Sequence, residues 1–197
     1  MNSRHLLFQL PLVLTLLAPA APAVAADPVA PKAAAMTFSF AGTAYFHRWS
    51  QRGQHEFTPQ KQTDLAKWND MVTLTVAEAA TTAEKVAEIA NRTLALYQQN
   101  GRVLKKASRP ASADRTAEHL IVAVFAQPEF LEASLARIVF VDGVGLTAVY
   151  SHRIYGKDVG AAMSMWLEKS EPDAERALMG WSDFPKPAAL KRLPPGS

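Results

Sequence analysis

The chain has 197 residues, 49% of them hydrophobic, with 21 basic and 18 acidic side chains and a formal net charge of +3. This length is typical of one domain with a full hydrophobic core, and so small a basic excess does not indicate a nucleic-acid-binding protein. The sequence contains no cysteine, which excludes a disulfide framework and leaves hydrophobic packing to hold the fold together.

The N-terminus has the pattern of a secretory signal peptide. Arg4 precedes an apolar run over residues 6–17, and small residues follow in an Ala-Val-Ala pattern that ends at Ala25. The apolar run contains a proline and is too short to cross a bilayer, so we predict cleavage after Ala25 or Ala26 rather than a membrane anchor. Without a cysteine, the chain cannot carry a lipoprotein anchor. We therefore expect residues 1–26 to be removed from a periplasmic or secreted protein that has no integral membrane span after cleavage.

Three further regions follow the signal peptide. Residues 27–36 are rich in proline and alanine and lack periodicity, which predicts a disordered leader. Residues 37–184 are expected to form a single α+β domain, and residues 185–197 an irregular, proline-rich tail.

The first half of the domain has the alternation of β structure. Residues 37–59 predict strands with a turn near Gly53 and an end at Pro59. Residues 60–68 have two large apolar side chains at helical spacing and predict about one or two helical turns. Residues 71–76 alternate again and predict a half-buried strand.

A long helix is predicted over residues 82–99. Thr81 and Glu84 have the spacing of a capping box at its start, and Gly101 supplies a stop signal at its end. The expected apolar stripe comprises Val86, Ile89, Ala90, Leu94 and Tyr97.

The strongest local signal is Asp142-Gly143 between two apolar, β-branched runs. Such a dipeptide favours a type I′ turn, and a two-residue loop pairs Val141 with Val144. Residues 119–125 are apolar on both sides, which predicts a central strand covered on both faces. The face expected to be shared within the hairpin comprises Val139, Val141, Val144, Leu146, Ala148, Tyr150 and His152.

Two C-terminal helices are predicted, one beginning near Asp158 and a second after a stop-and-restart signal at residues 170–173. Together the elements predict an α+β fold. Its antiparallel sheet of about five to seven strands would pack against the long helix and the two C-terminal helices.

The sequence contains no recognised catalytic motif: no cysteine nucleophile, no G-x-S-x-G elbow, no S-x-x-K sequence and no Walker sequence. It therefore identifies no catalytic residue and no cofactor. On balance it argues against an enzyme without deciding the question.

Histidines offer the sharpest chemical hypothesis. None has the spacing of a local zinc motif, so a metal site would have to be assembled by the fold. The competing interpretations are ordinary hydrogen-bonded histidines, or one histidine serving as a general base. The candidate metal ligands are His47, His55, His119 and His152.

Two surface features are candidates for binding a partner or ligand. Trp49 and Phe57 flank the N-terminal hairpin and would line a ligand groove unless they belong to the core. A basic cluster could receive an anionic headgroup or an acidic protein face, although a lysine-protected edge strand is the favoured interpretation. The cluster comprises Arg102, Lys105, Lys106 and Arg109.

The order of elements resembles that of the Mog1/PsbP-like α+β domains, which have a hairpin, a strand, one long helix, a run of antiparallel strands and a closing helix. The resemblance lies in topology and includes no family motif. It implies a non-enzymatic accessory or adaptor role in an exported or lumenal setting. The segments that correspond are residues 37–57, 71–76, 82–99, 103–149 and 159–167.

We therefore expect a non-enzymatic binding or accessory module, including an inhibitor-type protein. Its partner would be another exported protein or a small ligand, and not a nucleic acid. The alternative is a histidine-based metal-binding protein or metal-dependent hydrolase.

Overall fold

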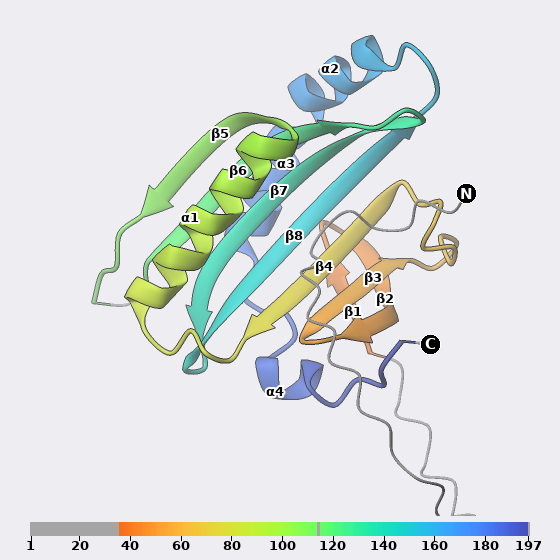
Figure 1. The fold of residues 1–197 in the computed structure, drawn as a ribbon. Coiled ribbons are helices and arrows are strands. Elements are labelled where there is room, and N and C mark those ends of the chain that lie inside the picture. The colour runs from red at the N-terminus through yellow and green to blue at the C-terminus, as the bar shows by residue number, and fades with distance from the viewer. Residues whose placement is uncertain (1–35, 114, 197) are drawn as a thin grey trace, which may run out of the picture. The chain divides into compact units, whose positions relative to one another are not determined.

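An eight-stranded antiparallel sheet organises the chain in a computed structural model that describes residues 36–113 and 115–196 (Figure 1). The strand order across the sheet is β1-β2-β3-β4-β8-β7-β6-β5. The predicted signal peptide and nearly all of the predicted leader lie outside the described residues. The strands are β1 (Thr37–Phe40), β2 (Thr43–Gln51), β3 (Gln54–Pro59), β4 (Asp70–Ala77), β5 (Arg102–Arg109), β6 (Glu118–Ala126), β7 (Phe130–Val141) and β8 (Val144–Tyr155).

The β7–β8 hairpin forms the middle of this sheet. Asp142 and Gly143 have φ angles of 50° and 83°, which are the positive values that a type I′ turn requires. Val141 pairs with Val144, so the register predicted from the two-residue loop is confirmed. On its other side β8 pairs with β4 along the whole length of β4. The hairpin therefore joins the two halves of the sheet.

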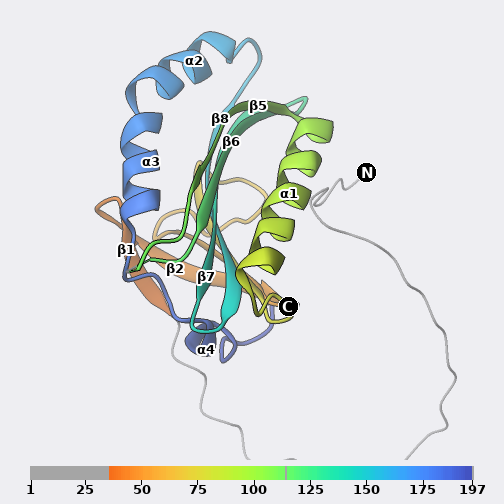
Figure 2. The ribbon, with the colours of Figure 1, turned by 90° about the vertical axis from the view of Figure 1, so that its left-hand side faces the viewer.

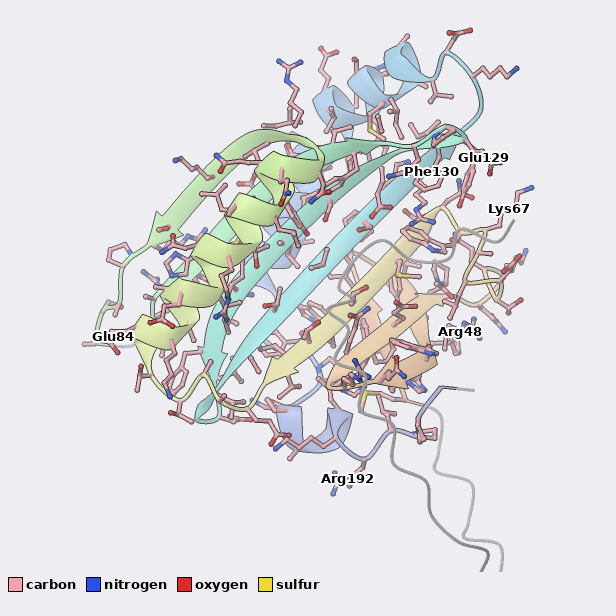
Figure 3. All side chains as sticks on the ribbon, in the orientation of Figure 1. Arg48, Lys67, Glu84, Glu129, Phe130 and Arg192 are labelled. Atoms are coloured by element: carbon pink, nitrogen blue, oxygen red, sulfur yellow. The ribbon has the colours of Figure 1, made fainter. Side chains whose placement is uncertain are left out.

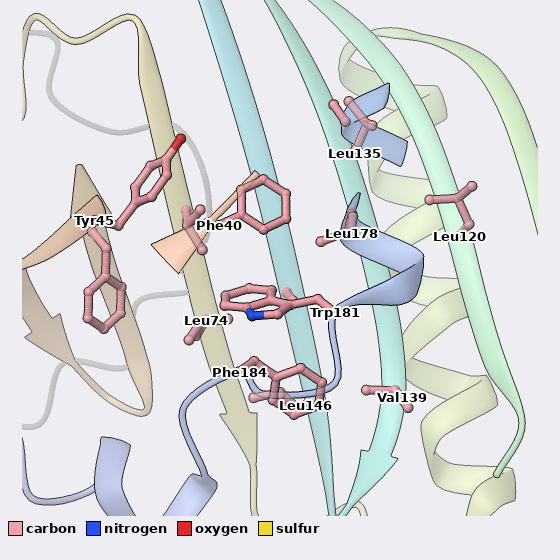
Figure 4. Packing of buried hydrophobic residues seen from close by; sticks show 14 of the residues in the cluster. Phe40, Tyr45, Leu74, Leu120, Leu135, Val139, Leu146, Leu178, Trp181 and Phe184 are labelled. Carbon is pink, nitrogen blue, oxygen red and sulfur yellow. The ribbon is translucent and has the colours of Figure 1, made fainter. Parts of the chain in front are cut away.

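Helices cover both faces of the sheet (Figure 2). Helix α1 (Ala83–Asn100) packs on β5 to β8, while α2 (Gly160–Lys169) and α3 (Glu171–Gly180) contact the hairpin from the opposite face. The core under α1 includes Val86, Tyr97, Ile121, Phe125 and Ile138. The larger core on the other face includes Leu74, Leu120, Leu135, Leu146, Leu178, Trp181 and Phe184 (Figure 4).

Helix α1 begins one residue later than its predicted capping box. The N-cap is Thr82, whose hydroxyl accepts a hydrogen bond from the backbone N–H of Lys85, so the prediction of Thr81 as the cap is wrong. Glu84 lies in the first turn, where an acidic side chain favours the N-terminal end of a helix (Figure 3). Gly101 ends the helix as predicted. A Cβ at Gly101 would lie 2.6 Å from the Phe125 ring, so glycine allows the helix end to approach β6.

The sheet has more strands than the five to seven predicted. Ala41 and Gly42 both have positive φ angles and form a tight turn that separates β1 from β2. The alternating pattern of residues 37–51 runs through this turn, because each flanking strand keeps its own period of two. The sequence pattern therefore did not separate β1 from β2.

Two irregular segments also differ from expectation. Residues 60–68 form turns rather than a helix, and Trp68 is buried there. The tail expected to be irregular contains α4 (Pro187–Leu190), and Leu190 is fully buried. The hydrophobic core thus extends past residue 184. Among the described helices, none has the length and apolar character needed to cross a bilayer.

Arg137 connects the sheet to the end of α3. Its side chain projects from β7 on the α3 face, where Nη2 lies 2.7 Å from Oε2 of Glu118 on β6. Nη1 donates hydrogen bonds to the carbonyl oxygens of Leu178 and Trp181, at 2.9 and 2.8 Å. The Glu118 side chain is 1% exposed and is paired with both Arg137 and Arg109, the latter at 3.1 Å.

We expect the substitution Arg137→Met to lower the free energy of unfolding by roughly 3 kcal/mol, because it leaves a buried carboxylate underpaired and removes hydrogen bonds to two backbone carbonyl groups. Urea denaturation at pH 7 measures this loss. Arg176→Met is the matched control, since Arg176 forms an exposed ion pair with Asp173 and should cost under about 0.5 kcal/mol. Equal losses in the two variants would show that the Arg137 network is not a structural support.

Candidate functional site

His47 and His55 lie on neighbouring strands and are joined through Ser50. Ser50 Oγ lies 2.6 Å from Nε2 of His47 and 2.7 Å from Nδ1 of His55. A register shift in β2 between His47 and Trp49 adds one residue, which brings His47 and Ser50 to the same side of the sheet. The hydroxyl has one hydrogen, so it donates to one ring and accepts an N–H from the other. We call these three residues the Ser50 cluster.

Burial keeps the Ser50 cluster uncharged at neutral pH. Ser50 and His55 are each 4% exposed, and Nε2 of His55 has no hydrogen-bond partner among the described residues. Burial, and then the neighbouring His47, lowers the pKa of His55 to about 4. Burial also lowers the pKa of His47.

The other two candidate ligands lie elsewhere. His119 contacts Ser108 Oγ through Nδ1, and His152 contacts Asp70. In the part of the chain that the structure describes, no three histidine or acidic side chains gather as possible ligands of one metal ion. The candidate metal ligands therefore occupy three separate places, and the metal site stays a prediction without an assembled ligand set.

The basic cluster lies on β5, the outermost strand at one edge of the sheet. Lys105 forms an ion pair with Glu175 at 2.7 Å, and Arg109 pairs with Glu118. Arg102 and Lys106 are exposed on the same strand. This placement favours the interpretation of a charged edge that resists pairing with another chain.

The predicted aromatic groove at Trp49 and Phe57 is not formed as a surface. Phe57 is fully buried and packs against Phe38 and His47, so it has no exposed surface to offer a ligand. Trp49 is partly buried, and Gly196 lies so close that a Cβ there would overlap the indole ring.

A different hollow, of about 250 Å³, lies between the β1–β2 turn, the start of β4 and the two C-terminal helices. Its walls include four aromatic side chains, with Asp70 and Asp173 as its charged groups. We call this hollow the aromatic pocket. The aromatic residues that line it are Phe40, Tyr45, Tyr150 and Trp166.

The carboxylate of Asp70 accepts two short hydrogen bonds on one oxygen and a longer one on the other. Tyr150 Oη and His152 Nδ1 both donate to its Oδ1, at 2.8 and 2.9 Å, and Gln62 Nε2 lies 3.4 Å from its Oδ2. Burial opposes the charged form of Asp70, but these hydrogen bonds outweigh it and lower the pKa of the carboxyl group. Asp70 is therefore a carboxylate at neutral pH, and Nδ1 of His152 carries the hydrogen.

The walls of the aromatic pocket are fixed by their neighbours. The ring of Trp166 stacks on His152, with centroids 4.5 Å apart and an interplanar angle of 6°. Tyr45 is 3% exposed, and its phenol oxygen has no hydrogen-bond partner among the described residues. In Figure 4 that oxygen points away from Trp181 and Phe184. Burial, and then the charge of Asp70, raises the pKa of both Tyr45 and Tyr150, so both phenols stay neutral.

Sequence reasoning did not find this pocket. It placed Tyr150 and His152 on one face of the hairpin, but it assigned no role to Asp70, Tyr45 or Trp166. Asp70 meets His152 because β4 pairs with β8, across 82 positions of the chain. No local motif records such a contact. Finding this pocket from the sequence would have required knowing that β4 pairs with β8.

A second hollow, of about 340 Å³, lies beside the end of α3. Its charged side chains include Arg137 with Glu118, and Lys186 with Asp142, so acidic and basic groups face each other. Arg137 already donates to backbone and carboxylate oxygens. Trp181 also lines this hollow, and its Nε1 is buried without a hydrogen-bond partner among the described residues.

Neither a comparison with protein-family models nor a search of curated proteins finds a match to this chain. The resemblance to the Mog1/PsbP-like domains therefore stays a prediction.

The Ser50 cluster makes stability depend on pH. In the unfolded chain His55 returns to a pKa near 6.5, whereas the folded chain resists protonation until about pH 4. The unfolded state thus binds more protons in this window, and stability is lost as the pH falls from 6.5 toward 4. We expect the stability loss between pH 7 and pH 4.5 to be about 2 kcal/mol smaller in His55→Gln than in the unaltered protein.

Urea denaturation at both pH values measures this difference. His119→Gln removes an imidazole outside the Ser50 cluster and should keep the pH dependence of the unaltered protein. If His55→Gln keeps it as well, protonation of His55 does not drive the acid loss of stability.

Proposed function

We propose that this protein is a non-enzymatic binding module that holds a small ligand in the aromatic pocket. The main support is the combination of aromatic walls with a carboxylate and a phenol among the lining side chains. Ligand sites are typically concave, largely apolar and equipped with a few well-placed polar groups. The aromatic pocket has these three properties in one place.

The position of the aromatic pocket also supports a binding role. Its lining comes from β1, β2, β4, β8 and the C-terminal helices, so several elements fix its shape before a ligand arrives. The stacked pair of Trp166 and His152 holds one wall, and the hydrogen bonds to Asp70 hold the floor. A preformed site loses little conformational entropy on binding.

The expected periplasmic or secreted location belongs to the same proposal, since it rests on residues 1–26. A protein partner is a variant in which the ligand is part of another exported chain. The histidine-based metal protein or hydrolase is the competing hypothesis, and metal analysis of the purified protein tests it directly. Stoichiometric zinc or copper that is lost in His47→Ala or His119→Ala would favour that hypothesis.

A pocket-blocking variant tests the proposed function. Thr43 is exposed and lines the aromatic pocket, so Thr43→Trp should fill the hollow without disturbing the core. We expect compounds found by saturation-transfer NMR with a library of small organic molecules to bind this variant at least about tenfold more weakly.

Thr81→Trp is the matched control, because Thr81 is exposed and lies outside the lining of the pocket. It should leave every affinity unchanged. A library in which no compound binds the unaltered protein, or in which Thr43→Trp weakens no compound, would contradict the proposed function.

A further inference from the structure

The chemistry of the ligand can be inferred from the side chains that line the aromatic pocket, above all Asp70 and Tyr45. This inference rests on the proposed function. We propose that the aromatic pocket binds a protonated alkyl amine, with its ammonium group between Asp70 and Tyr45 and its alkyl chain against the aromatic walls.

Charge is the first argument. The charged residues that line the aromatic pocket are Asp70 and Asp173, and both are acidic. Asp173 pairs with Arg176 on the exposed side of α3, where solvent screens the charge. Asp70 receives hydrogen bonds from Tyr150, His152 and Gln62, and none of these three residues lines the pocket as a fixed cation. A cationic ligand would supply the countercharge that the lining residues lack, whereas an anion would meet two carboxylates.

The hydrogen-bonding capacity of Asp70 is the second argument. A carboxylate offers about four lone-pair positions on its two oxygens. Among the described residues, Oδ1 receives the hydrogen bonds from Tyr150 and His152, while Oδ2 receives only the long contact from Gln62, at 3.4 Å. Oδ2 therefore retains room for a further N–H donor.

Tyr45 is the third argument, and it points to a ligand independently of the charges. Its side chain lines the aromatic pocket and is 3% exposed, yet its phenol oxygen has no partner among the described residues. The phenol oxygen is not among the fully buried polar atoms that lack a partner, so it reaches the space of the pocket, where water or a ligand can complete its hydrogen bonding. A phenol oxygen accepts an N–H, and an ammonium group that bears hydrogens can donate to Tyr45 and Asp70 at once.

The aromatic walls complete the recognition. The face of an aromatic ring attracts a cation, and tryptophan does so most strongly. Trp166 and Tyr150 supply such rings beside Asp70, with Trp166 held in place by its stack on His152. A quaternary ammonium would satisfy the rings but has no N–H for Tyr45. The geometry therefore favours an amine with hydrogens on nitrogen.

The amine could be a free small molecule or the side chain of a lysine in a peptide, which share the same chemistry. Calorimetric titrations with n-butylammonium and with Nα-acetyl-lysine amide separate these sources. Binding of both supports the proposal and shows that the amine can be carried on a peptide. Binding of n-butylammonium alone supports it for a free amine.

The neutral probe 1-butanol and the anion butyrate test the role of charge on the unaltered protein, without any variant. We expect n-butylammonium to bind at least about tenfold more tightly than either. Tetramethylammonium should also bind more weakly, because it has no N–H. If 1-butanol or butyrate binds as tightly as n-butylammonium, the amine proposal fails.

Variants then assign the atoms. Asp70→Asn should weaken n-butylammonium at least about tenfold and Tyr45→Phe about threefold, whereas Asp183→Asn removes an exposed charge outside the pocket and should change the affinity less than about twofold. Thermal melts show whether each variant folds. An Asp70→Asn variant that folds and binds n-butylammonium normally would overturn the assignment.

Failure of this proposal is distinguishable from failure of the proposed function. Compounds that Thr43→Trp excludes but n-butylammonium does not displace would leave the pocket as a ligand site and refute the amine. If Thr43→Trp affects no compound at all, the pocket itself is not a ligand site.

Discussion

The buried contact between Arg137 and Glu118 fixes how the C-terminal helices lie on the sheet. A helix ends with carbonyl groups that have no partner within the helix, and a cation beside them is favourable. Arg137 supplies that cation from the middle of the sheet by donating to Leu178 and Trp181. Glu118 on the neighbouring strand balances the charge of Arg137, so neither group is buried alone. The indole of Trp181 lies in the core, and α3 lines the aromatic pocket with Asp173 and Ala174.

The aromatic pocket depends on this anchoring and on one strand register. Phe40 and Tyr45 come from the N-terminal hairpin, which packs against Trp181. Asp70 comes from the first residue of β4 and lies directly opposite His152 on β8. A shift of one residue in this pairing would turn His152 to the other face of the sheet and remove it from Asp70. The position of Asp70 and of the aromatic side chains in the pocket therefore depends on the same strand pairing and helix packing that form the hydrophobic core.

Local sequence signals predicted the elements but not the contacts between them. The Asp142-Gly143 turn needs positive φ at both positions, which few dipeptides accept, so its strands and register followed from the sequence. The Ser50 cluster needs a bulge in β2, and no residue type marks that bulge reliably. Asp70 is unremarkable in sequence because its role comes from a strand far along the chain. Contacts of this kind depend on tertiary pairing, which periodicity does not encode.

The pKa shifts in the Ser50 cluster and the aromatic pocket are consistent with the proposed binding role. A general acid or base works best when its pKa lies near the working pH. Here burial lowers the pKa of His55 to about 4, hydrogen bonds hold Asp70 in its charged form, and burial raises the pKa of Tyr45 and of Tyr150. Each of these shifts moves the pKa of the group further from pH 7, so the protonation state of the group is fixed at neutral pH. The Ser50 hydroxyl is bonded to two imidazole rings, whereas the aromatic pocket has a fixed carboxylate and a phenol that no described residue pairs with. A fixed charge with spare acceptors suits a site that holds a ligand better than one that exchanges protons with it.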